Sequence, residues 1–134
     1  MIKEIKKLSI KQSEFQSLEY SIYLPDDYKL KNYPLVLFLH GAGERGSDLS
    51  YVENHGIPKL VKNGRKFPFI ILAPQCPSQH WWSDPLPLDF LLLLVSEIVK
   101  KYQINEHHVF CTGLSMGGYG TLALSIKNPE LFSA

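Results

Sequence analysis

The segment Gly113-Leu114-Ser115-Met116-Gly117 decides the fold, because it places a serine between two glycines where two kinds of structure meet. Residues 109–112 are typical of a short buried strand, and residues 122–126 have a helical pattern. A serine at such a tight turn has a strained backbone and an exposed hydroxyl, and a Cβ at either glycine would clash with the neighbouring strand and helix. The segment therefore predicts that Ser115 is a nucleophile. The alternative is a glycine-rich turn with a capping serine.

Strand-like segments precede this turn. Residues 18–24 alternate in the period of a strand and end at the turn signal Pro25-Asp26-Asp27. Residues 35–39 and 69–73 are continuous apolar runs, which are typical of strands buried on both faces.

Helical patterns separate or follow these strands. Apolar residues fall at helical spacing between Leu88 and Tyr102, and a weaker helix is predicted over residues 57–62. The helix after Ser115 is expected to end near Lys127, before Asn128-Pro129. Strands that alternate with helices predict an α/β fold with a mostly parallel sheet flanked by helices.

The composition suits one globular domain of 134 residues, with 45% hydrophobic residues, 20% charged residues and a net charge of +1. So balanced a charge does not favour binding to nucleic acid or to an anionic membrane. The longest apolar run, residues 90–95, is far shorter than the roughly 18 residues of a membrane span. The N-terminus has basic residues but no apolar segment, so no secretory signal is visible. The two cysteines, Cys76 and Cys111, do not make a disulfide framework. We therefore expect a cytoplasmic protein.

A second glycine-rich segment, His40-Gly41-Ala42-Gly43-Glu44-Arg45-Gly46, follows the strand predicted over residues 35–39. Its glycines fit the G-x-G-x-x-G pattern of dinucleotide-binding proteins, which requires a helix to begin inside the motif and an acidic residue to end the next strand. Here residues 47–51 are polar and poorly periodic, and Ala73-Pro74-Gln75 carries no carboxylate. The pattern therefore argues against a nucleotide cofactor.

The alternative is an oxyanion loop. A His-Gly-x-Gly turn at the carboxyl end of a strand can direct a backbone N–H into a site, where it acts with the N–H of the residue after the nucleophile. The two donors would be Ala42 and Met116, with Gly41 and Gly43 shaping the turn. We expect His40 to shape this loop through hydrogen bonds; the alternative is a direct role in proton transfer.

Three stretches with these residues, 35–46, 73–82 and 112–120, resemble the α/β-hydrolase superfamily, in the branch of serine esterases near the predicted peptidases, the phospholipase/carboxylesterases and the prolyl-oligopeptidase-like proteins. The resemblance implies a nucleophile at Ser115 in the Gly113 to Gly117 turn, an oxyanion hole at Ala42 and Met116, and no cofactor. It places Trp81 and Trp82 near the substrate pocket, although packing of a long loop would equally explain them.

One departure concerns the catalytic triad, which in this fold runs Ser, then Asp or Glu, then His along the chain. No histidine and only one acid, Glu130, follow Ser115 before residue 134. We therefore expect residues 1–134 to be the N-terminal portion of a single α/β-hydrolase domain that is truncated after the helix of the nucleophile turn. The segment 129–134 is expected to lead into a further strand.

The expected function is hydrolysis of small-molecule carboxylic esters through an acyl-enzyme on Ser115, with the remaining triad residues beyond residue 134. The alternatives are a peptidase or amidase with the same machinery, and a non-catalytic half-domain that serves as a binding module. A metal site is not expected, because no zinc spacing is formed by the candidate ligands Cys76, His80, His107 and His108.

Overall fold

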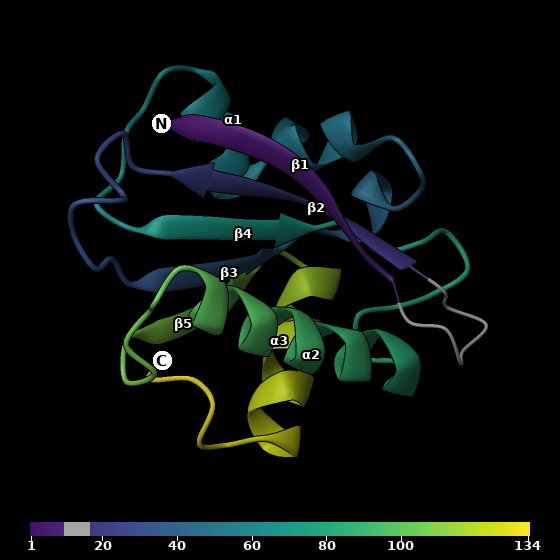
Figure 1. Cartoon of the computed structure of the whole chain (residues 1–134). Helices are drawn as coiled ribbons and strands as arrows, with labels where there is room; N and C mark the ends of the chain where they lie inside the picture. The colour runs from purple at the N-terminus through teal and green to yellow at the C-terminus, as the bar shows by residue number, and fades with distance from the viewer. Residues whose placement is uncertain (10–16) are drawn as a thin grey trace.

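A five-stranded sheet is the framework of the computed structural model, which describes residues 1–9 and 17–134 (Figure 1). The strands lie in the order β1-β2-β4-β3-β5. Their bounds are Ile2–Ser9 (β1), Ser17–Leu24 (β2), Leu35–Leu39 (β3), Ile70–Pro74 (β4) and Val109–Gly113 (β5). The pairs β3–β4 and β3–β5 are parallel, whereas β1–β2 and β2–β4 are antiparallel. The predicted α/β class is confirmed, with a mixed sheet in the described part.

Helices cover both faces of this sheet. The α-helices are α1 (Gly56–Lys62), α2 (Pro85–Lys101) and α3 (Met116–Lys127), and two 3₁₀ segments are η1 (Ala42–Glu44) and η2 (Leu49–Asn54). Figure 1 shows α2 and α3 together on one side of the sheet. Their apolar residues share the larger core with alternate residues of the strands, such as Leu37 and Leu72. The opposite strand residues, Phe38 and Ala73, pack with η2 and α1 in a smaller core.

The parallel strands place the two predicted functional segments at one edge of the sheet. β3 and β5 are paired over their whole length, with Leu39 opposite Gly113. Both strands therefore end at the same level. The predicted oxyanion loop that follows β3 and the serine turn that follows β5 lie side by side at that edge.

The end of the described chain runs beside β5. The Ser133 N–H donates to the carbonyl of Val109 at 2.7 Å, and the Cys111 N–H donates to the carbonyl of Ala134 at 2.9 Å. These bonds connect the segment to β5, and a further strand beyond it stays a prediction.

Candidate active site

Ser115 stands at a sharp turn between β5 and α3. Its backbone has φ 55° and ψ −112°, a left-handed conformation that is strained for a residue with a side chain. The two flanking glycines allow the turn to pack. A Cβ on Gly117 would lie 1.8 Å from the carbonyl oxygen of Leu39, and one on Gly113 would lie 2.1 Å from that of Gly117. Only glycine fits at either position without moving the backbone.

The loop after β3 touches this turn directly. The Leu114 N–H donates to the carbonyl of Leu39 at 3.1 Å. A Cβ on Gly41 would lie 3.4 Å from the carbonyl oxygen of Leu114 and 3.8 Å from the Cβ of Ser115. The structure thus brings together two segments that lie about 70 residues apart in the sequence.

The peptide between Gly41 and Ala42 is held in one orientation. Its carbonyl oxygen accepts the Nδ1–H of His40 at 2.6 Å and the N–H of Glu44 at 3.3 Å. Because this peptide is trans, the Ala42 N–H lies on the edge opposite these two donors. Met116 is the first residue of α3, so its N–H is one of the first-turn donors that have no acceptor within the helix. Both N–H groups are therefore suited to bind an oxyanion.

His40 uses both of its ring nitrogens inside the protein. The residue is 1% exposed, and its Nε2 accepts the N–H of Cys76 at 2.9 Å while Nδ1 donates to Gly41. Burial lowers the pKa of His40 below its ordinary value of 6.5, so the ring is neutral at physiological pH. With both nitrogens occupied, the ring suits a role in shaping the loop rather than in proton transfer.

The two tryptophans differ sharply in their surroundings. Trp82 is fully buried, and its indole N–H donates to the carbonyl of His40 at 3.0 Å. It also packs on α3, since a Cβ on Gly120 would lie 2.5 Å from the Cβ of Trp82. Trp81 is 47% exposed, and its ring lies 5.3 Å from the guanidinium carbon of Arg45. Of the two, Trp81 alone has an exposed ring.

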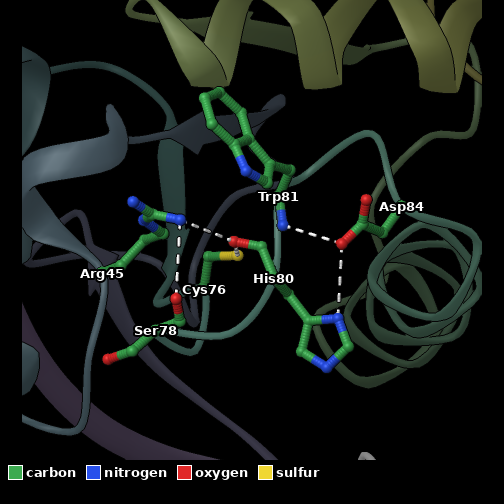
Figure 2. Close-up of polar contacts among 6 residues, drawn as sticks. All are labelled: Arg45, Cys76, Ser78, His80, Trp81 and Asp84. Carbon is green, nitrogen blue, oxygen red and sulfur yellow. Dashed lines mark hydrogen bonds and ion pairs between the residues drawn. The ribbon is translucent and has the colours of Figure 1, made fainter.

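Arg45 joins the loop after β3 to the segment 76–84. Its Nε donates to the carbonyl of Ala42 at 3.0 Å. Its Nη1 reaches the carbonyls of His80 at 3.3 Å and Ser78 at 3.5 Å, as Figure 2 shows. Within that segment, Asp84 accepts the N–H of Trp81 at 2.9 Å and pairs with the His80 ring at 3.4 Å. The sequence analysis did not single out Arg45, although it lies in the motif that continues to Gly46.

Glu44 was also missed. This carboxylate is 6% exposed, and its Oε1 pairs with Nε2 of His55 at 3.2 Å. The sequence alone does not show that Glu44 is buried beside the candidate oxyanion hole, because its burial depends on how η1 folds back over Gly41.

The remaining predicted positions lie apart from the serine turn. No described histidine is hydrogen-bonded to the Ser115 hydroxyl, and His107, 83% exposed, precedes β5 at the far end of that strand. Within residues 1–9 and 17–134, no three His, Cys, Asp or Glu side chains gather in a way that could hold a metal ion. None of the helices seen in the described ranges is both long and apolar enough to cross a membrane.

Two curated proteins resemble the chain in sequence. A poly(3-hydroxyoctanoate) depolymerase of Pseudomonas fluorescens is 27% identical over 122 residues, which cover 76% of this chain and 43% of the depolymerase. Feruloyl esterase B of Neurospora crassa is 27% identical over 124 residues, which cover 84% of this chain and 40% of that enzyme. The chain thus spans about two fifths of the length of these relatives.

Solved structures of esterases share the fold. A thermostable esterase matches with a TM-score of 0.73 and 33% identity, over 96% of this chain and 39% of that one. An acetyl xylan esterase from Aspergillus awamori matches with a TM-score of 0.71 and 21% identity, over 98% of this chain and 50% of that one. The family model described as "Putative esterase" matches residues 15–134. These matches confirm the resemblance to serine esterases of α/β-hydrolase type, and the chain belongs to this esterase family.

Proposed function

We propose that the protein is a serine hydrolase that cleaves small-molecule carboxylic esters through an acyl-enzyme on Ser115. The observation that supports this proposal is the contact between the strained Ser115 turn and the Gly41 loop, which would bring the serine hydroxyl near the candidate donors Ala42 and Met116. The esterase family of the chain supports the same chemistry.

In the proposed reaction, the Ser115 hydroxyl attacks the ester carbonyl and loses its proton to a histidine. The N–H groups of Ala42 and Met116 bind the negative oxygen of the tetrahedral intermediate, where charge develops. The alcohol leaves with the proton from the histidine, and water then attacks the acyl-enzyme and releases the acid. His40 keeps its ring neutral and orients the Gly41–Ala42 peptide.

We place the histidine and the acidic residue of the triad after residue 134, in the same domain. The curated relatives are more than twice as long as the matched segment, which leaves ample chain for both. Residues 1–134 alone would then be inactive, since a serine hydroxyl without a base is a weak nucleophile. We also propose a cytoplasmic setting.

Labelling of the whole enzyme with a fluorophosphonate probe, together with turnover of a p-nitrophenyl ester, tests the proposal. Ser115→Ala should abolish both signals. Ser125→Ala is the matched control, because Ser125 lies on α3, the helix that follows Ser115, and its hydroxyl donates to the carbonyl of Thr121. Labelling that persists in Ser115→Ala would remove Ser115 from the mechanism. Faster cleavage of a matched anilide than of the ester would favour an amidase, and a probe that labels nothing would favour a non-catalytic binding module.

A further inference from the structure

Glu44 is a buried acid at the place where a negative charge is least expected. It lies in the loop that is proposed to stabilise an oxyanion, and its side chain is only 8% exposed. Burying a carboxylate is costly unless hydrogen bonds or an opposite charge compensate. His55 supplies one such partner, at 3.2 Å from Oε1.

The second oxygen of this carboxylate lies beside Gly41, which also borders Ser115. Oε2 lies 3.3 Å from the position of a Cβ on Gly41, and the Cβ of Ser115 lies 3.8 Å from the same point. The carboxylate and the serine side chain therefore border the same side of Gly41.

Oε2 has no donor among the described residues, since the Glu44 side chain is paired only with His55. In that part of the chain, Ser21 Oγ is the one fully occluded side-chain oxygen or nitrogen without a partner. Oε2 is not one of these fully occluded atoms, and it is an acceptor left without a protein donor in these residues.

The backbone of Glu44 is held from two sides. The Glu44 N–H donates to Gly41, and its carbonyl accepts the Nε2–H of Gln75 at 2.9 Å. Gln75 is 3% exposed and also donates to the carbonyl of Asp48 at 2.7 Å. A side chain that starts from a fixed backbone and is anchored at Oε1 by His55 loses little freedom when a ligand arrives.

We propose that Glu44, supported by His55, is a specificity-determining residue that accepts a hydrogen bond from a substrate hydroxyl close to the scissile ester. This inference rests on the proposed function. The donor is a neutral hydroxyl rather than an ammonium group, because Arg45 already places a positive charge against the same loop, with its Nε 3.0 Å from the carbonyl of Ala42. The preferred substrates are thus hydroxy esters, with the hydroxyl on the acyl chain or on the alcohol.

The test compares kcat/KM of the whole enzyme for pairs of esters that differ by one hydroxyl. A 3-hydroxybutyrate ester against the butyrate ester probes the acyl side, and a glycerol monoester against a propyl ester probes the alcohol side. We expect the wild type to prefer the hydroxy ester of one pair. A hydrogen bond to a charged acceptor supports a preference of roughly 10-fold to 100-fold.

Glu44→Gln should remove most of that preference, and His55→Gln should reduce it in the same pair. The matched control is Glu53→Gln. Glu53 is another buried acid, 8% exposed, but it binds Tyr23 at 2.9 Å and Lys3 at 2.7 Å, on strands away from the serine turn. The Glu53→Gln enzyme should keep the full preference for the hydroxy ester.

If folded wild type and folded Glu44→Gln show the same preference for the hydroxy ester, the inference is overturned and the Ser115 mechanism stays intact. If Glu44→Gln fails to fold, the same conclusion follows from an unchanged preference in His55→Gln. Hydrolysis that survives Ser115→Ala would instead contradict the proposed function itself, so the two failures are distinct.

Discussion

The imidazole of His40 accepts the backbone N–H of Cys76 at 2.9 Å, and so ties together the segments that follow the neighbouring parallel strands β3 and β4. The same ring donates to the carbonyl of Gly41 through Nδ1. A neutral ring can donate from one nitrogen and accept at the other, whereas a protonated ring can only donate. The arrangement therefore depends on the neutral form.

The first prediction concerns pH. Burial lowers the pKa of His40 below 6.5, so below that pH the unfolded chain binds a proton that the folded chain excludes. The free energy of unfolding should therefore fall as the pH drops from about 6.5 towards the folded-state pKa, and this effect should vanish well above 6.5. His40→Gln keeps one donor and one acceptor but does not titrate. Urea unfolding at pH 5.5 and 7.5 should show a smaller pH dependence in the variant, and parallel behaviour of the two proteins would contradict the prediction.

The second prediction concerns the Ala42 N–H. Ala42→Pro removes this donor, and losing one oxyanion donor costs about 3–4 kcal/mol, or on the order of 10²–10³ in kcat. Ala42→Gly is the control, because it keeps the N–H at the start of η1. Ester turnover by the whole enzyme, with folding checked by circular dichroism, measures the difference. Near wild-type turnover in a folded Ala42→Pro enzyme would show that another group binds the oxyanion.

Most of the fold could be predicted from local patterns. The apolar runs at 35–39, 69–73 and 109–112 fall on β3, β4 and β5, within one residue at each end. They were visible because strands buried on both faces are apolar throughout. β1 was missed, since Ile2 and Ile5 are 41% and 63% exposed and the strand has no apolar face to detect. Among the described strands β1 pairs with β2 alone, through main-chain hydrogen bonds that leave no side-chain pattern.

The candidate site was predictable only where a residue type is required by backbone geometry. The glycines around Ser115 follow from clashes that any side chain would cause. The contacts of Arg45 with residues 78 and 80, and of Glu44 with His55, depend on how loops fold together after the sheet has formed. Polar side chains of that kind have no period in the sequence, so nothing distinguishes them from solvated surface charges.

The third prediction compares two adjacent glycines of α3. Gly117→Ala should cost several kcal/mol or prevent folding, because its Cβ would lie 1.8 Å from the Leu39 carbonyl, an atom of the sheet that cannot move cheaply. Gly118→Ala meets nothing closer than 3.7 Å, and alanine in a helix gains about 0.5–1 kcal/mol over glycine. Thermal melts should therefore shift in opposite directions. Similar melting temperatures for the two variants would contradict the packing at the turn.

The fourth prediction concerns the two cysteines. Burial raises the pKa of Cys76 to about 12 and that of Cys111 to about 11, so almost no thiolate exists near neutral pH. Neither thiol should react with Ellman's reagent at pH 8 in the folded protein, and both should react in guanidinium chloride. Rapid native reaction of either cysteine would show that its segment opens readily, and Cys76→Ser and Cys111→Ser would identify which one.

The last prediction concerns residues 1–134 expressed alone. β5 ends the described sheet, and residues 133 and 134 pair with only part of it. Next to it, Tyr119, Leu122 and Ile126 of α3 are 65%, 62% and 82% exposed. An unpaired strand edge beside an apolar helix surface promotes association between chains, so sedimentation should show dimers or larger species.

The double variant Leu122→Lys/Ile126→Lys should be less associated, whereas Leu30→Lys, at an exposed leucine in the β2–β3 connection, should change little. A monodisperse wild-type monomer would mean that this surface is stable in water, and would favour the self-contained binding module over a segment of a larger hydrolase domain.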